Sequence, residues 1–285
     1  MTDYESFLKQ KDVSTNTIAS YLADLEAFKN WYRGTTGEEF DPGAIGPIDV
    51  AEYKRYMLNR NRKPATINRH LASLSAYFRW AVERGLSPQN PVDGIKSVKQ
   101  ERLAPKWLER REQLSLLRAV QASKKPRDIA LINLLLHTGL RVSEVCALDL
   151  DDVFLRERSG WVVVRSGKGG KRREVPLNAT VRSSLADWIE ARCREPGPLF
   201  FGQKGNRMTS RGIEHLIAKY ARIAGVEKVT PHSLRHTFCK SLIDSGESLD
   251  RVAVLAGHES LNTTARYTRP SVGDLQKSVD KLAWE

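Results

Sequence analysis

Three segments of this chain carry side chains that suit chemistry on a phosphate diester. Two lie near the C-terminus, Pro231-His232-Ser233-Leu234-Arg235-His236 and the stretch from Leu255-Ala256-Gly257-His258 to Arg266-Tyr267-Thr268. The third lies upstream and supplies a second arginine, in Thr138-Gly139-Leu140-Arg141-Val142-Ser143-Glu144. The planar fork of an arginine matches two phosphate oxygens at once, and a tyrosine hydroxyl can attack phosphorus and hold it covalently. The combination predicts a phosphate-binding set with a tyrosine as a candidate nucleophile.

The spacing within these segments predicts the helices that hold the charged groups. Arg141 and Glu144 are three residues apart, as are His232 and Arg235, so each pair shares one face of a helix. Pro231 at a helix start would leave the first-turn amides directed outward, where a helix favours an anion. Taken alone, the first pair would be read as a surface ion pair and the second as a capping histidine beside a surface arginine. Their order along one chain is what favours a site.

A glycine-rich turn predicts a mobile lysine for the same site. Trp161–Arg165 and Arg173–Leu177 have the composition of strands, and Ser166–Lys171 between them is a hairpin-turn signal. Lys168 lies at the tip, where its ammonium could reach one oxygen of a ligand, although a lysine in a turn is more often merely solvated. A basic cluster suited to phosphates adjoins it: Lys171, Arg172 and Arg173.

The chain is basic, and the charge is unevenly distributed. Its 285 residues carry a formal net charge of +12, and the pI is about 9.7. Residues 1–100 hold 14 Lys and Arg against 12 Asp and Glu, whereas residues 101–285 hold 32 against 22. A basic C-terminal two-thirds indicates a polyanionic partner, although charge alone fits an ordinary soluble basic protein equally well.

Several function classes leave no signal in the sequence. Cys146, Cys193 and Cys239 are widely spaced and form no metal-binding pattern, so we expect reduced thiols and no metal. There is no carboxylate cluster for paired Mg²⁺ ions and no Gly-x-x-x-x-Gly-Lys-Ser/Thr loop, so we expect no cofactor. The N-terminus is polar and acidic, and no apolar run approaches membrane-spanning length. We therefore expect a cytoplasmic, nucleoid-associated protein without a membrane partner.

Periodicity predicts a mainly α fold with a small β-sheet, divided into two domains. The first, residues 1–97, should contain helices over 14–33, from Asp49 through Leu58, and over 65–84. Ser14 would cap the first of these helices, and Asp49 with Glu52 would cap the second. Residues 98–106 are polar and unpatterned and are interpreted as a linker. The second domain, residues 107–285, should add further helices over 109–122, 127–137, 178–195, 210–224, 232–245, 248–256 and 260–268.

As an ordered set, the motifs resemble those of the tyrosine recombinases of the phage integrase family, nearest in plan to the compact Xer-type and resolvase-type members. The resemblance covers essentially the whole chain and is strongest in four segments: Thr138–Leu148, Gly167–Leu177, Pro231–Gly246 and Leu255–Thr268. Ala256 is a small departure, because the family pattern has leucine there. The resemblance implies an N-terminal helical, SAM-like core-binding domain followed by a mixed α/β catalytic domain.

The resemblance also implies which residues would bind the phosphate. Arg141 and Arg235 would clamp the non-bridging oxygens of a scissile phosphate, and Glu144 would orient the first arginine or its neighbours. His258 would hydrogen-bond the same phosphate. With these motifs included, the polar face of helix 65–84 is expected to contact DNA rather than only solvent. That face carries Asn68, Arg69, Ser73 and Arg79.

Three further residues would move protons and form the covalent bond. Tyr267 would be the nucleophile and form a 3′-phosphotyrosyl link. Lys168 would protonate the leaving 5′-oxygen, and His232 would assist proton transfer at the tyrosine. Because the phosphotyrosine keeps the energy of the broken diester, rejoining would need no nucleotide cofactor.

The implied protein is a site-specific recombinase that acts as a homotetramer on two DNA duplexes through a Holliday junction. Each core site would have two inverted arms, and residues 269–285 would dock on a neighbouring protomer. With no additional arm-site-binding domain expected, action would centre on a short core site. Integration, excision and resolution share this plan and stay open. Two alternatives also stay open: DNA relaxation of the type IB topoisomerase kind, and a non-catalytic DNA-binding accessory factor.

Overall fold

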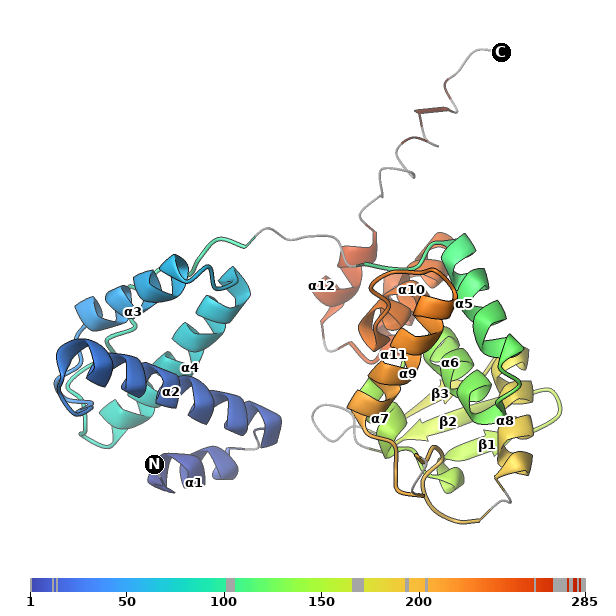
Figure 1. The fold of residues 1–285 in the computed structure, drawn as a ribbon, viewed down its shortest axis with the longest axis horizontal. Coiled ribbons are helices and arrows are strands. Elements are labelled where there is room, and N and C mark those ends of the chain that lie inside the picture. The colour runs from blue at the N-terminus through green and yellow to red at the C-terminus, as the bar shows by residue number, and fades with distance from the viewer. Residues whose placement is uncertain are drawn as a thin grey trace. The chain divides into compact units, whose positions relative to one another are not determined.

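The computed structural model divides the chain into two compact units, Met1–Arg102 and Leu103–Glu285, each with its own hydrophobic core (Figure 1). The structure describes residues 2–11, 13, 15–100, 106–165, 172–192, 195–202, 205–258, 260–268, 276, 279, 280 and 282. The side chains of Thr2, Asn262 and Arg266 are outside that description. Most of the expected linker and most of the C-terminal tail also lie outside the described residues.

The described part of the first unit is a bundle of helices. They are α1 (Thr2–Gln10), α2 (Thr15–Thr36), α3 (Pro47–Asn59) and α4 (Pro64–Glu83). The three helices predicted from periodicity are confirmed, whereas α1 was not predicted. Their apolar stripes meet in an aromatic core, where Phe28 and Phe78 are fully buried. Tyr53 packs edge-on against Phe28 with ring centroids 5.1 Å apart.

The start of α3 differs from the predicted capping arrangement. Gly46 is the N-cap, and Pro47 occupies the first turn, where its missing N–H is no loss. Asp49 is the third helical residue, and its carboxylate accepts a hydrogen bond from the Gly46 amide at 2.8 Å. The predicted pair of Asp49 with Glu52 was therefore wrong, because the capping carboxylate acts backward on Gly46. Ser14, the expected cap of α2, lies outside the described residues.

The second unit combines helices with one small sheet. Its described elements are α5 (Arg110–Ala122), α6 (Pro126–Thr138), α7 (Val142–Ala147), η1 (Leu150–Asp152), β1 (Val153–Leu155), β2 (Gly160–Val164), β3 (Arg173–Pro176), α8 (Ala179–Ala191), α9 (Ser210–Ile223), α10 (Pro231–Asp244), α11 (Leu249–Ala256), α12 (Leu261–Thr264) and η2 (Ala265–Tyr267). The mainly helical class with a small sheet is confirmed. The helix predicted over 260–268 is a short α-helical turn followed by a 3₁₀ turn.

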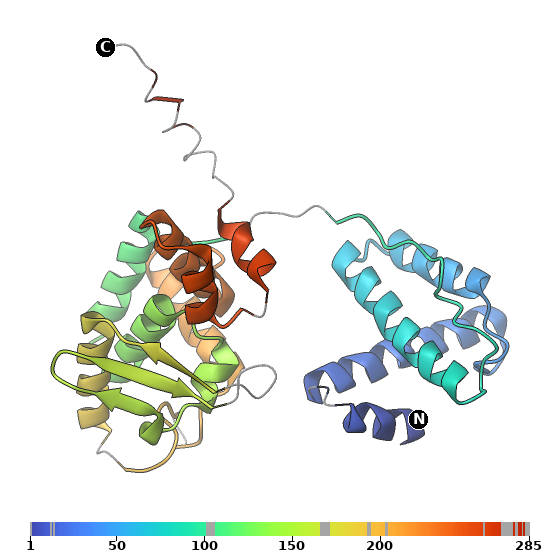
Figure 2. The same ribbon diagram turned by 180° about the vertical axis from the view of Figure 1, so that it is seen from behind.

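The sheet is antiparallel with the strand order β1-β2-β3. Val162 lies opposite Val175 and is buried in the core. On the outer face, the rings of Phe154 and Trp161 stack with centroids 5.2 Å apart. Figure 2 shows the strands along one side of this unit. Strand β1 was not predicted because it has only three residues.

Helix α6 forms the centre of the second unit, as its nearly continuous apolar sequence predicted. It packs against α5, α8 and α10. Its fully buried apolar residues are Ala130, Leu131, Ile132, Leu134 and Leu135. The core therefore fixes the C-terminal end of α6, from which the chain turns into α7. Within the described residues, no helix is both long and apolar enough to cross a membrane.

Candidate active site

A tight turn joins α6 to α7 and delivers the first predicted arginine. Gly139 ends α6 in the left-handed conformation, with φ +62° and ψ 19°. A Cβ atom on this glycine would lie 2.3 Å from Cδ1 of Phe238 on α10, so a larger residue has no room. Arg141 is the N-cap of α7, and Glu144 is its third helical residue. The turn therefore brings both residues next to α10.

Glu144 is a buried carboxylate held by two arginines. Its oxygens accept hydrogen bonds from the backbone amide of Arg141 at 2.8 Å and from Nη1 of the same residue at 2.9 Å. Arg173 on β3 donates from both terminal nitrogens, at 2.9 and 2.8 Å. Burial raises the pKa of Glu144, but the hydrogen bonds from Arg173 and Arg141 outweigh burial and bring the pKa below its usual value. Glu144 is therefore an anion that fixes both guanidiniums.

Arg141 and Arg235 are both held by the carbonyl oxygen of a helix-ending glycine. Nη2 of Arg141 donates to Gly257 at 2.8 Å, and Gly257 ends α11 with φ +65°. Nη1 of Arg235 donates to Gly139 at 2.5 Å. Arg235 is buried, and burial together with the nearby charge of Arg141 lowers its pKa. Two predicted arginines from distant segments thus meet at one place.

Tyr267 is buried between two histidines. Its side chain is 2% exposed, and its hydroxyl lies 2.5 Å from Nδ1 of His236. The ring of His258 is stacked on the tyrosine ring, with centroids 6.2 Å apart and an interplanar angle of 11°. Nδ1 of His258 lies 2.8 Å from the hydroxyl oxygen of the buried Thr264. The hydroxyl expected to act as nucleophile is therefore in contact with an imidazole.

His258 is held in its neutral form. Burial lowers its pKa to about 4, and the positive charges of Arg235 and Arg141 act in the same direction. A neutral imidazole has one donor and one acceptor nitrogen. With Nδ1 facing Thr264, the opposite ring nitrogen is the one that could meet a ligand.

The histidine bonded to Tyr267 is His236, and not His232, which the resemblance implied for proton transfer at the tyrosine. His232, on the first turn of α10, is exposed, and its ring centroid lies 6.4 Å from that of His236. His236 was overlooked, although it follows His232 by four residues and therefore shares its helix face. That spacing was the signal that could have found it.

The predicted basic cluster divides into different environments. Lys168 and Lys171 lie outside the described residues. Arg172 is exposed, whereas Arg173 turns inward to Glu144. A Cβ atom on Gly257 would lie 2.8 Å from the Cζ of Arg173, so this guanidinium is tightly enclosed. Both terminal nitrogens of Arg173 hold Glu144 in this structure, and its contact with DNA stays a prediction.

Of the four residues on α4 predicted to contact DNA, two are bonded internally and two are exposed. Asn68 exchanges two hydrogen bonds with the backbone of Val98, at 2.9 and 2.8 Å. Ser73 is buried and donates to Asp24 at 2.8 Å. The polar atoms of both side chains serve internal contacts in this structure, and DNA contact by Asn68 and Ser73 stays a prediction. Arg69 and Arg79 are exposed and keep the predicted role open.

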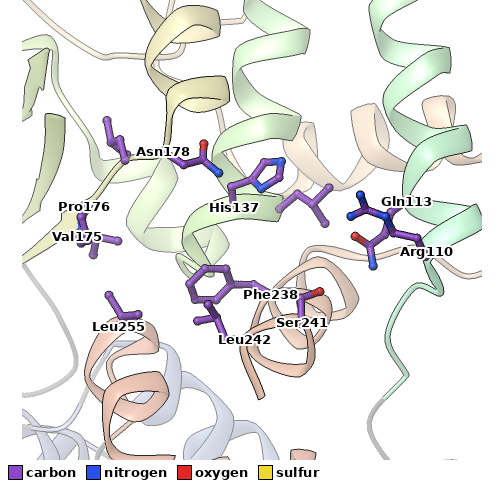
Figure 3. A pocket seen from close by; sticks show the side chains of 12 residues that line it. Arg110, Gln113, His137, Val175, Pro176, Asn178, Phe238, Ser241, Leu242 and Leu255 are labelled. Carbon is purple, nitrogen blue, oxygen red and sulfur yellow. The ribbon is translucent and has the colours of Figure 1, made fainter. Parts of the chain in front are cut away.

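A separate cavity of about 470 Å³ adjoins α10 in the second unit (Figure 3). Its walls are largely apolar, and Phe238, Leu242 and Leu255 contribute to them. Arg110 and His137 add positive or titratable groups. Its lining includes none of the residues predicted to carry catalysis. Among the described residues, no three His, Cys, Asp or Glu side chains are grouped in a way that could hold a metal ion.

The architecture, the paired arginines and the buried tyrosine are those of a tyrosine recombinase. Residues 106–273 match the model of the phage integrase family, and residues 1–85 match the phage integrase N-terminal SAM-like domain. The chain belongs to the phage integrase family. The resemblance found in the sequence motifs is thereby confirmed.

Similar proteins cover the chain almost end to end. Tyrosine recombinase XerC of Thermodesulfovibrio yellowstonii is 32% identical, over 99% of this chain and 95% of that protein. The TnP I resolvase of Bacillus thuringiensis is 27% identical, over 98% of both. The XerH site-specific recombinase in a pre-cleavage complex with its difH substrate is 26% identical, with a TM-score of 0.70 over 94% of this chain and 79% of that one. A lambda integrase dimer bound to a COC′ core site shares the fold, with a TM-score of 0.76 at 18% identity over 100% of this chain and 96% of that one.

Proposed function

We propose that this protein is a site-specific DNA recombinase that cuts and rejoins strands through a 3′-phosphotyrosyl intermediate formed on Tyr267. The observation that carries the proposal is the convergence of three separate segments of the chain, in which Arg235 lies close enough to both Arg141 and Tyr267 to interact electrostatically with each. The likeness to XerC and to recombinases solved on their DNA sites supports DNA as the substrate.

The chemistry assigns each group a task. The Tyr267 oxygen attacks the scissile phosphorus, the bond to the 5′-oxygen breaks, and the 3′-phosphate becomes joined to tyrosine. Arg141 and Arg235 stabilise the added negative charge of the five-coordinate phosphorus, and one such donor contributes roughly 3–4 kcal/mol. The proton of Tyr267 passes to an imidazole. His236 lies within hydrogen-bond distance, and His232, one turn earlier, takes part once DNA is bound.

Burial of the nucleophile sets a condition on the reaction. Because Tyr267 is 2% exposed, a phosphate reaches its hydroxyl only if the segment of α12 and η2 shifts.

His258 donates to the phosphate, and Glu144 keeps Arg141 in place. The leaving 5′-oxygen takes its proton from Lys168. Rejoining needs no nucleotide, because the phosphotyrosine bond keeps the energy of the diester that it replaces.

The Tyr267 assignment is tested with a suicide DNA substrate nicked near the crossover. Wild-type protein should form a covalent adduct, and Tyr267→Phe should form none. Tyr220→Phe is the matched control, because Tyr220 is a buried tyrosine of the same unit that donates to Asp128 at 2.7 Å. Absence of an adduct with wild-type protein on its proper site would remove the enzymatic proposal and leave a DNA-binding accessory factor. Relaxation of supercoiled DNA without strand exchange would favour the topoisomerase alternative.

The Lys168 assignment has its own test. Lys168→Ala should slow cleavage of ordinary DNA and regain most of the rate on a substrate with a 5′-thio leaving group, which needs little protonation. An unrescued variant would place the acid elsewhere. Arg172→Ala serves as the control, because it removes a positive charge near the same turn and should give no thio-specific rescue.

We propose assembly as a homotetramer on two inverted-repeat core sites, with exchange through a Holliday junction. Residues 1–97 and 107–285 would close around each arm, joined by the linker 98–106. Val279 and Leu282 in the tail are exposed apolar residues, which supports docking of residues 269–285 on a neighbouring protomer. Truncation at Pro270 should abolish cooperative assembly on DNA while leaving single-arm binding. We place the protein in the cytoplasm on nucleoid DNA, in integration, excision or resolution.

A further inference from the structure

The first unit contains a buried carboxylate whose partners all come from one helix. Asp24 on α2 is 2% exposed. Its Oδ2 accepts hydrogen bonds from Nη1 of Arg69 at 2.5 Å and from the hydroxyl of Ser73 at 2.8 Å. Its Oδ1 lies 3.2 Å from Nε2 of His70. All three partners belong to α4, so Asp24 connects the interior of α2 to one face of α4.

Burying the Asp24 carboxylate is an inefficient way to stabilise the first unit, which indicates a role besides stability. Removing a carboxylate from water costs several kcal/mol, and apolar residues often fill such a position as well or better. Burial lowers the pKa of His70, against the attraction of Asp24, so its imidazole is neutral at pH 7. Its other nitrogen lies 3.1 Å from the hydroxyl of Tyr53. Arg69 is therefore the charged partner of Asp24.

Arg69 is also the part of this network that reaches solvent. Its side chain is 47% exposed, whereas that of Asp24 is almost completely enclosed. The guanidinium stands at the wall of a hollow of about 430 Å³ between α2, α3 and α4. The hollow is also lined by Trp31, Tyr56 and Arg62. Asp24 thus acts as an internal support that fixes one terminal nitrogen of a partly exposed guanidinium at the wall of this hollow.

Arg79, on the same helix, is not held by a buried carboxylate in the way that Arg69 is, within the part of the chain that the structure describes. It is exposed as well, but its Nε donates only weakly to a carbonyl of its own helix, Ser75, at 3.3 Å. A guanidinium without a fixed direction can follow a phosphate, which tolerates many angles. A guanidinium with a fixed direction suits a partner that must be met in one geometry.

We propose that Arg69, aimed by Asp24, is a specificity-determining residue that reads a guanine in the major groove. The inference rests on the proposed DNA-binding function and deepens it. One N–H of Arg69 is used by Asp24, and a guanidinium has four more. Two parallel donors match O6 and N7 of guanine, and this pairing discriminates against other bases by roughly 1–3 kcal/mol, or about 5- to 150-fold. Helix α4, with 20 residues, is a helix of the kind that the major groove admits.

The test is a selection of bound duplexes from a randomised pool, using the full-length protein and sequencing of the bound fraction. Wild-type protein should enrich a consensus with one G·C pair whose replacement lowers affinity at least fivefold. Arg69→Lys keeps the charge and loses the fork, so it should lose the preference at that pair and keep the others. Asp24→Asn should weaken the same preference. Arg79→Ala is the matched control and should lower affinity for all sequences without changing the consensus.

The outcomes separate the inference from the function beneath it. If wild-type protein enriches a consensus that Arg69→Lys and Arg69→Ala leave unchanged, the reading role is refuted while DNA binding stands. A uniform loss of affinity in Arg69→Ala that Arg69→Lys restores would make Arg69 a phosphate contact and also overturn the inference. A wild-type protein that enriches no sequence would remove the proposed function itself. The two Arg69 variants decide the matter even if Asp24→Asn fails to fold.

Discussion

Replacing Glu144 with glutamine tests how much its contacts with arginines contribute to stability, beyond its role in capping α7. Glu144 and Glu112 occupy the same position in two capping boxes, and each accepts a hydrogen bond from the N-cap amide at 2.8 Å. Only Glu144 is buried beneath guanidiniums. The pair Glu144→Gln and Glu112→Gln therefore measures what the arginines add.

The expected magnitudes differ severalfold. A capping box accepts glutamine as well as glutamate, so Glu112→Gln should change the free energy of unfolding by less than about 0.5 kcal/mol. At Glu144 the substitution removes the charge from three guanidinium contacts and directs an NH₂ donor at Arg173. Breaking a buried ion pair costs about 3–5 kcal/mol. At about 2–4 °C for each kcal/mol, the melting temperature of the second unit should fall by about 6–20 °C.

Calorimetry of the full-length protein at pH 7 without DNA provides the measurement. The two units have separate cores, so the transition of the second unit is followed and that of the first is an internal reference. Equal shifts for the two variants, within about 0.5 kcal/mol, would refute the reasoning that Glu144 is a charge hub. The suicide substrate adds a functional readout, because a displaced Arg141 should slow adduct formation in Glu144→Gln and leave Glu112→Gln unchanged.

Four further outcomes follow from the site. Gly139→Ala should destabilise the second unit and stop cleavage, because its Cβ would meet Phe238 at 2.3 Å, and the added Phe238→Ala should relieve only part of the loss, as the backbone strain remains. His258 has a folded pKa of about 4, below its unfolded value, so it contributes stability above roughly pH 6.5 that is lost as the pH falls toward 4. With partial solvent exposure this contribution is about 2 kcal/mol. In urea titrations across that pH range, the free energy of unfolding of His258→Gln should lack this part of the pH dependence. His236→Gln should slow adduct formation at least tenfold and shift its pH profile if the imidazole accepts the Tyr267 proton, whereas an unchanged profile would make His236 only a packing partner. DNA affinity should fall steeply with salt, by roughly 10³-fold or more between 50 and 200 mM for six or more phosphate contacts, and a flat salt response in a gel-shift titration would contradict binding through the basic unit.

The sequence predicted most of the helices because burial leaves a periodic record. The apolar run of α6 and the apolar stripe of α4 predicted helices that face the core. The stripe consists of Ile67, Leu71 and Leu74, which are buried in the structure. The short elements left no such record, and β1 and α1 were missed. Asp49 was misplaced because a capping carboxylate can act on either side of a helix start, and only the backbone of Gly46 decides between them.

The site was predictable in its chemistry but not in its contacts. Arg141, Arg235 and Tyr267 were singled out because their types suit phosphoryl transfer and their order resembles that of the family, and the structure brings the two arginines together. Arg172 and Arg173 are adjacent and chemically identical, yet a strand sends neighbours to opposite faces, and the tertiary position of Glu144 decides which one is internal. Ser73 likewise looked like a surface residue until α2 placed Asp24 against it.

The arginine cluster around Glu144 also fixes the electrostatic balance of the site. Three guanidiniums, those of Arg141, Arg173 and Arg235, face one carboxylate, and His258 is neutral at pH 7. The described part of the site thus carries two uncompensated positive charges. In the proposed reaction a phosphodiester brings one negative charge, and the five-coordinate phosphorus brings two. Because the Tyr267 proton stays within the site on an imidazole, the net charge does not change, but a second negative charge develops on the phosphoryl oxygens. The guanidiniums that repel one another in the free protein therefore favour the step over the ground state.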